Sequence, residues 1–194
     1  LPQDLAQTKL VWVADVGGGT TDFSLVKVEL EEDGQPKLTR IGVGNHLILG
    51  GDNMDLALAH LAEARLGNTE RLSAGRLAQL SERCRAAKEQ LLAPDAPEQV
   101  NVTLLGSGSR LIGASRSATI TREDVKRIVL DGFFPPNDAQ EPAKRARGGI
   151  VEFGLPYASD PAITRHLAGF LRQHAQAARE ARGVEDDGRL PVAD

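Results

Sequence analysis

The residues with the clearest capacity for chemistry lie in the string Asp-Val-Gly-Gly-Gly-Thr-Thr-Asp, from Asp15 to Asp22. Three glycines follow a strongly apolar segment, so the backbone can turn sharply and present its N–H groups to a ligand. Such a turn suits phosphate oxygens, and a threonine hydroxyl adds a polar group there. The alternative is a purely structural, glycine-rich hairpin with an Asx-type turn and no ligand. The predicted phosphate-binding residues are Gly17, Gly18, Gly19 and Thr20.

Two carboxylates flank this turn and have the chemistry of a magnesium site. Asp15 ends the apolar segment, where a charge is costly unless it has a partner. We predict that Asp15 and Asp22 hold Mg²⁺ through its water molecules, because Mg²⁺ dehydrates reluctantly. Asp15 is also the predicted catalytic residue, since its charge would serve the metal and the attacking water. The turn joins strand to strand, whereas the Walker loop and the dinucleotide fingerprint join a strand to a helix.

A second glycine turn, Gly50-Gly51-Asp52, leads into a predicted helix. Helix N-termini attract anions through free N–H groups and the helix dipole. Taken alone, a simple strand-to-helix turn is the more economical interpretation. Together with the first turn, Gly50 and Gly51 become candidates for the nucleotide site.

Strands are needed to position these turns, and the apolar pattern predicts three of them. Residues 9–16 are almost continuously apolar, which is typical of a strand buried on both faces in the middle of an α/β sheet, with Trp12 in the core. Residues 23–30 and 37–49 form the next two strands, joined by tight turns. The sequence therefore predicts an antiparallel meander over residues 9–49.

Helical periodicity dominates the rest of the chain, interrupted by one predicted hairpin. Thr121-Arg-Glu-Asp124 has the spacing of a capping box, with Asp in place of Glu. The predicted elements are a helix over 52–66, a helix over 73–93, a hairpin over 100–120, a helix over 121–134, a loop over 135–158, a helix over 159–182 and an acidic tail or linker over 183–194.

Composition excludes several classes of protein. The chain has 194 residues, 23 basic and 27 acidic side chains, and a net charge of −4, so it lacks the basic excess of a nucleic-acid surface. Its 41% apolar content argues against disorder. The single cysteine, Cys84, excludes an internal disulfide and favours a reducing compartment. No apolar run reaches the roughly 20 residues that a membrane helix needs, and the opening residues have no signal-peptide pattern. We expect a cytoplasmic protein with neither a nucleic-acid nor a membrane partner.

The two glycine turns and their spacing resemble the actin-like ATPase superfamily, and within it the 70-kilodalton heat-shock (DnaK-like) chaperones. Ser117-Ala-Thr-Ile-Thr-Arg122 resembles the run that leads into the next helix of these chaperones. The segment Cys84 to Leu91 resembles their adenosine-contacting helix. The resemblance extends from about residue 10 to residue 134.

The resemblance implies a fold, a ligand and partners. The implied fold is an α/β, actin-like (ribonuclease H-like) lobe over residues 1–134, with an α+β subdomain inserted at 52–134. The implied ligands are ATP or ADP with Mg²⁺, and Lys88 is implied to contact the nucleotide. The implied partners are the other lobe of the same protein, client proteins and co-chaperones, with hydrolysis only in the complete protein. This chain alone is expected to be inactive as an ATPase.

The adenosine-contacting helix departs from the family pattern. Where the chaperones have Glu, Lys, Arg and Ser, this sequence has Arg85, Lys88, Glu89 and Leu92. Only the lysine keeps its type, which leaves a nucleotide sensor that does not hydrolyse ATP as an alternative. A filament-forming or cell-division actin homologue is a further alternative, because those proteins also carry both glycine turns.

Overall fold

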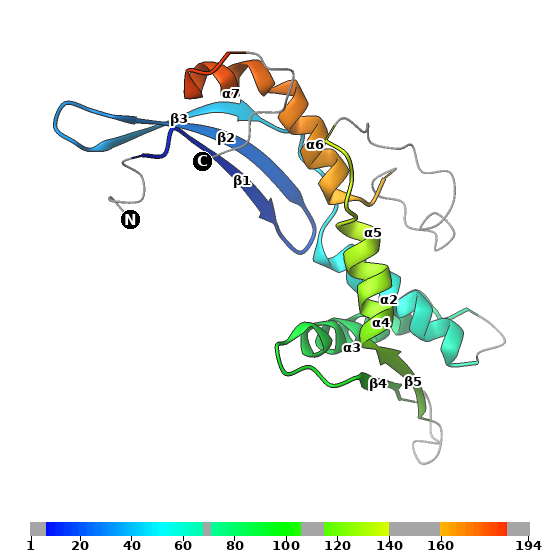
Figure 1. Ribbon diagram of the computed structural model, residues 1–194. Helices are drawn as coiled ribbons and strands as arrows, with labels where there is room; N and C mark the ends of the chain where they lie inside the picture. The colour runs from blue at the N-terminus through cyan, green and yellow to red at the C-terminus, as the bar shows by residue number, and fades with distance from the viewer. Residues whose placement is uncertain (1–6, 68–70, 106–114, 140–159, 186–194) are drawn as a thin grey trace.

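The computed structural model describes residues 7–67, 71–105, 115–139 and 160–185, in an α/β arrangement (Figure 1). Its first part is an antiparallel sheet of strand order β1-β2-β3, made of β1 (Leu10–Val16), β2 (Thr21–Leu30) and β3 (Pro36–Val43). Two helices, α6 (Ile163–Gln173) and α7 (Ala175–Arg182), pack on the sheet. Between the sheet and the helices, the ring of Phe23 in β2 packs against that of Phe170 in α6, with centroids 5.7 Å apart. The predicted antiparallel meander is therefore present.

The predicted burial of β1 is wrong. Leu10 is fully buried, but Trp12 is 38% and Val13 44% exposed, and Asp15 is also exposed. The physical reason is the position of the strand: among the described residues, β1 is an edge strand that pairs only with β2. An apolar run indicates that a strand can be covered on both faces. In the described part of the chain, however, Leu10 is the only residue of β1 that is buried.

The third strand is shorter than predicted. It ends at Val43, six residues before the predicted end at residue 49, and residues 44–49 cross towards α2 (Gly51–Arg65). Leu47 forms an isolated antiparallel bridge with Thr21, with N–H···O distances of 2.9 and 3.1 Å. The Thr21 hydroxyl also donates to the carbonyl of Leu49 at 2.7 Å. This crossing segment is thereby tied to the turn end of the β1–β2 hairpin.

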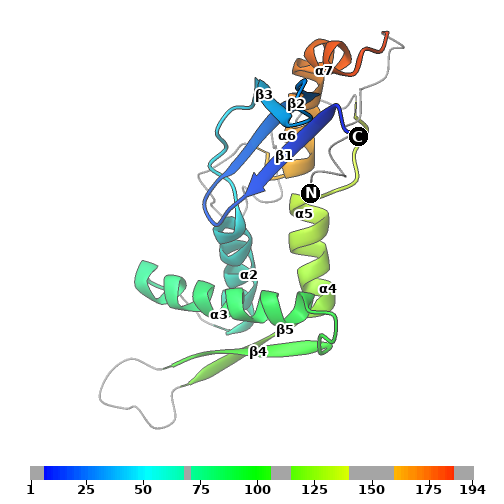
Figure 2. The ribbon, with the colours of Figure 1, turned by 90° about the vertical axis from the view of Figure 1, so that its left-hand side faces the viewer.

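The second part of the molecule is built on α2 and α3 (Ala74–Leu92), with a two-stranded sheet of β4 (Gln99–Leu104) and β5 (Arg116–Thr121). After β5 the chain forms α4 (Arg122–Val125), a π-helical segment η1 (Lys126–Leu130) and α5 (Asp131–Phe133). In Figure 2, α3 and the β4–β5 hairpin lie across the lower ends of α2 and α4. The apolar side of α3 is buried at Leu80, Cys84, Ala87 and Leu91, and Leu77, at the same helical spacing, is half-buried.

The predicted capping box at Thr121 is present. The Thr121 hydroxyl accepts from the amide of Asp124 at 3.1 Å, and the Asp124 carboxylate accepts from the amide of Thr121 at 2.9 Å. Arg65, at the end of α2, donates two hydrogen bonds to Asp124, at 2.5 and 2.8 Å. Burial pushes the pKa of Asp124 upward, but the hydrogen bonds from Arg65 and Thr121 outweigh it and hold that pKa well below its usual range. This ion pair joins the end of α2 to the start of α4.

The C-terminal helix differs from its predicted bounds. It begins at Ile163 instead of residue 159, and it breaks at His174, whose backbone (φ −105°, ψ 15°) is not helical. The His174 ring packs against Phe170, with centroids 4.8 Å apart, and against Gly42 of β3. The predicted hairpin tip near residue 107, most of the predicted loop 135–158 and the predicted tail beyond residue 185 lie outside the described residues.

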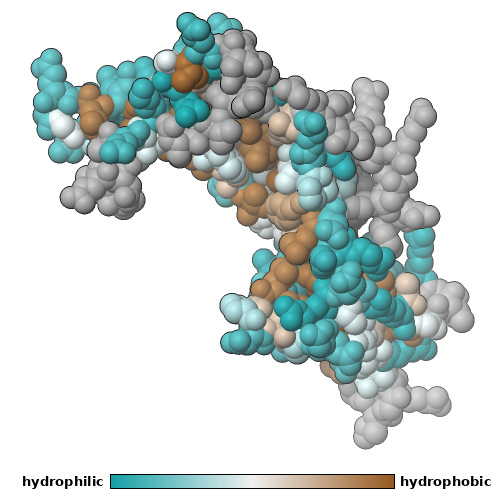
Figure 3. All heavy atoms as spheres, in the orientation of Figure 1, coloured by the Kyte–Doolittle hydropathy of each residue, from teal (hydrophilic) through white to brown (hydrophobic). Residues whose placement is uncertain are grey.

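The surface view shows hydrophobic side chains along the middle of the molecule, between the sheet and the lower helices, with hydrophilic surface over much of the second part (Figure 3). Among the helices of the described residues, none combines the length and apolar character that crossing a bilayer requires.

Candidate functional site

The first glycine turn (residues 17–20) closes the β1–β2 hairpin. The Gly17 amide donates to the Thr20 carbonyl at 2.8 Å, which fixes the turn. None of its three glycines has a positive φ, so their lack of a side chain matters for space and access, not for backbone conformation. The three glycines are exposed.

The remaining amides of this turn are available to a ligand. Within the described part of the chain, the N–H groups of Gly18, Gly19 and Thr20 donate to no protein acceptor. Successive free backbone N–H groups in a tight turn form an anion-binding concavity. The structure thus brings together the four residues predicted to bind phosphate.

Two carboxylates face one another beside the turn. Asp15 and Asp22 are directly paired across the β1–β2 ladder, so their side chains share one face of the hairpin. Like charges at paired positions repel, and a shared cation would offset that cost. Asp22 also lies 2.8 Å from Nδ1 of His46, a contact that sequence reasoning missed because 24 residues separate the two. Among the described residues no cluster of three or more His, Cys, Asp or Glu side chains could hold a metal directly.

The second glycine turn (residues 50–51) packs directly on the first. The amides of Gly51 and Asp52 donate to the carbonyls of Gly17 and Gly18, at 3.0 and 2.8 Å. A Cβ on Gly50 would lie 2.4 Å from the Gly18 oxygen, so only glycine fits. The N-terminus of α2 is therefore occupied by the hairpin.

The amide of Gly50 is also used, since it donates to Oδ1 of Asn53 at 2.8 Å. The N–H groups of Gly50 and Gly51 consequently have protein acceptors. Where the sequence suggested free donors for an anion, the structure shows two glycines that hold the hairpin against α2. That Gly50 and Gly51 contact the nucleotide stays a prediction. Such a contact would come from their position next to the first turn and not from hydrogen bonds donated by these amides.

Asp52 adds a third negative charge at the glycine turn. A Cβ on Gly18 would lie 3.2 Å from Oδ1 of Asp52, so this carboxylate borders the turn. An anionic phosphate that bound there would meet negative charge from Asp52 and from the Asp15–Asp22 pair. The donor set therefore fits phosphate together with a divalent cation better than phosphate alone.

Lys88 lies at the same junction. Its ammonium nitrogen is 2.6 Å from Oδ1 of Asp55 and 3.8 Å from the position that a Cβ on Gly51 would take. The Asp55 side chain is only 5% exposed and that of Lys88 13%. Burial raises the pKa of Asp55, and the Lys88 and Arg85 charges oppose that rise. Sequence reasoning missed Asp55; its place on α2, three residues after Asp52, was the available signal.

Two of the other three aligned positions of α3 contact each other. Arg85 lies 3.6 Å from Glu89 and 4.0 Å from Asp55, and Leu92 is 47% exposed. Cys84, on the buried side of α3, is inert as a nucleophile, because burial raises the pKa of its thiol to about 12, with the Asp55 charge adding to the rise.

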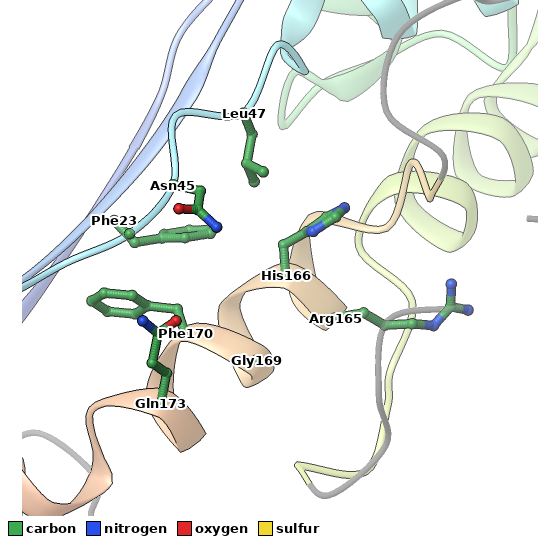
Figure 4. Close-up of a pocket in the computed structure, with 9 residues that line it drawn as sticks. Phe23, Asn45, Leu47, Arg165, His166, Gly169, Phe170 and Gln173 are labelled. Carbon is green, nitrogen blue, oxygen red and sulfur yellow. The ribbon is translucent and has the colours of Figure 1, made fainter. Parts of the chain in front are cut away.

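A pocket of about 260 Å³ lies between the crossing segment and α6 (Figure 4). The rings of Phe23 and Phe170 line one side, and Asn45 and Gln173 contribute amide groups. Leu47 also lines the pocket and bridges to Thr21, the residue that directly follows the glycine turn, so the pocket adjoins the turn end of the β1–β2 hairpin. No feature of the sequence predicted it.

The comparison with known families agrees with this geometry. A sequence model of the Hsp70 protein family matches residues 3–142, which contain the sheet, both glycine turns and the helices α2 to α5. The chain belongs to the Hsp70 protein family. It is thus a nucleotide-binding chaperone lobe of the actin-like fold, and proteins of this family bind ATP or ADP with Mg²⁺. No curated protein matches the chain.

Proposed function

We propose that this chain binds the phosphates of ATP at residues 17–20, with Mg²⁺ held through water by Asp15 and Asp22. The observation that carries the proposal is that the amides of Gly18, Gly19 and Thr20 donate to no acceptor in the described part of the chain. They lie at one turn, flanked by two paired carboxylates. A bound Mg²⁺ would supply positive charge against the phosphates. The chain's own amides would hold phosphate oxygens, which is positioning and electrostatics rather than covalent chemistry.

Asp15 has the catalytic role in this proposal. Its carboxylate lies on the same face of the hairpin as that of Asp22. There it can accept a hydrogen bond from a water molecule beside the phosphates. Lys88 contacts the nucleoside side of the ligand, and Gly50 and Gly51 bring α2 up against the turn. Residues 52–134, from α2 to α5, then form the inserted α+β subdomain that covers the nucleotide.

Hydrolysis in this proposal belongs to the complete protein, where a second lobe grips the nucleotide and excludes water. A nucleotide sensor without hydrolysis is the second candidate, and one observation favours it. Arg85 and Glu89 pair with each other, and Leu92 lies exposed where the family has a polar side chain. Client proteins and co-chaperones are the partners that the chaperone proposal entails.

The test is calorimetric titration of Mg-ATP into the full-length protein and into Gly18→Val. Valine would cover the free amides, whereas its Cβ would meet only the carboxylate end of Asp52, which can move. We expect affinity to fall about tenfold or more, because a hydrogen bond to a charged group contributes about 1.5–3 kcal/mol. Thermal unfolding should change little.

Gly75→Val is the matched control, because Gly75 is exposed at the start of α3 with open space around it. It should leave the affinity for Mg-ATP unchanged. Equal affinity in Gly18→Val and the unmodified protein, with native unfolding curves, would remove the glycine turn as the phosphate site.

A further inference from the structure

The junction of α2 and α3 contains a buried ion pair that the proposed function does not require by itself. Asp55 projects from the second turn of α2, and Lys88 reaches it from α3, with Nζ and Oδ1 2.6 Å apart. A carboxylate that is only 5% exposed is costly unless a cation compensates it. Lys88 is thereby fixed by Asp55 and is not a freely moving surface lysine.

The position in which Lys88 is fixed matters. Its ammonium lies beside Gly51, whose amide donates to the Gly17 carbonyl of the first glycine turn. The hydrogen bond from Gly51 thus ties the start of α2 to the glycine turn, and the Lys88 ammonium lies next to that residue. Arg85, the other cation near Asp55, lies farther away at 4.0 Å and is 45% exposed.

We infer that Asp55 is a positioning residue, which holds the Lys88 ammonium at the second glycine turn so that it can bind the nucleotide. This inference rests on the proposed function. Asp55 itself, buried beneath Lys88, does not touch the ligand. An ammonium group has three donors, so Lys88 can pair with Asp55 and still donate to a ligand hydroxyl or phosphate oxygen. Without Asp55 the lysine side chain gains rotamer freedom and the ligand must order it again.

A double-mutant cycle on nucleotide binding tests this inference. The variants are Asp55→Asn, Lys88→Met and the double substitution, each titrated with Mg-ADP in the full-length protein. We expect each single variant to bind about five- to tenfold more weakly, within the range of coupling between contacting groups. Because Asp55 acts through Lys88, Asp55→Asn should cause no further loss when Lys88 is already methionine.

A purely structural role of Asp55 gives a different result. In that case Asp55→Asn would weaken binding by the same factor in both backgrounds, and the inference would be overturned. It would also be overturned if Asp55→Asn bound Mg-ADP as tightly as, or more tightly than, the unmodified protein. If the unmodified protein itself bound no nucleotide, the proposed function would fail, which is a separate outcome.

Two exposed residues of α3 supply matched controls. Glu82→Gln and Arg83→Met change the net charge as the test variants do, and both side chains are exposed. They should leave Mg-ADP affinity unchanged. Lys88→Arg keeps the charge without altering α2, so it remains informative if Asp55→Asn does not fold. Its affinity for Mg-ADP should be within about threefold of that of the unmodified protein. A loss of affinity as large as that of Lys88→Met would contradict the inference that Asp55 positions a positive charge for the nucleotide.

Discussion

The two glycine turns look alike in the sequence but differ in where their amide protons go. At residues 17–20 three N–H groups have no acceptor among the described residues and the glycines are exposed. At residues 50–51 both N–H groups have acceptors, and a side chain on Gly50 would collide with the Gly17 and Gly18 carbonyls. The first turn has the properties of a ligand site, and the second has those of a packing contact. Glycine content alone does not separate a ligand site from a packing contact, whereas accounting for every N–H group does.

The largest expected effect is that of Gly50→Ala on stability. A Cβ would lie 2.4 and 2.5 Å from two backbone oxygens, which cannot move as a side-chain end can. We expect the free energy of unfolding to fall by about 3 kcal/mol, the upper range for overpacking. Urea unfolding measures this, with Gly75→Ala as the control. Alanine at that exposed helical position should leave the free energy of unfolding unchanged or raise it slightly. An unchanged free energy of unfolding in Gly50→Ala would show that the second glycine turn does not pack closely on the first.

Asp15→Asn should separate hydrolysis from binding in the full-length protein. The substitution keeps the shape of the side chain but removes the charge that would serve the metal and the attacking water. We expect single-turnover hydrolysis to fall about a hundredfold, the lower range for loss of a catalytic group, with ATP affinity changed far less. Glu32→Gln, exposed between β2 and β3, should behave like the unmodified protein. Equal turnover in Asp15→Asn would make Asp15 a structural residue.

Asp124→Asn should affect stability alone, because the Arg65–Asp124 pair lies on the far end of α2 from both glycine turns. Hydrogen bonds from Arg65 and Thr121 lower the pKa of Asp124 in the folded state. The resulting stability is therefore present above the unfolded pKa of about 4 and is lost as the pH falls below it.

At pH 7 the variant should lose about 2 kcal/mol, and its stability should depend less on pH between about 5 and 2. Chemical unfolding at several pH values measures both effects. The same acid-side loss of stability in variant and unmodified protein would contradict the role given to Asp124. Weaker nucleotide binding would contradict its separation from the site.

The sequence predicts those features that depend on nearby residues. The β1–β2 turn follows from glycines flanked by apolar runs, and the Thr121–Asp124 box follows from spacing alone. Features that depend on distant partners were missed. The exposure of Trp12 depends on which strands flank β1, and the burial of Asp55 depends on Lys88, 33 positions later in the chain. The use of the Gly51 amide by the Gly17 carbonyl is equally non-local.

The central claim is that phosphate binds the free amides of the first glycine turn and not those at the start of α2. The direct measurement is an amide ¹H–¹⁵N spectrum of the protein during titration with Mg-ATP. The account predicts that the signals of Gly18, Gly19 and Thr20 shift most, while those of Gly51 and Asp52 keep the hydrogen bonds that they already make and shift little. Large shifts at Gly51 and Asp52, with Gly18 to Thr20 unmoved, would contradict it.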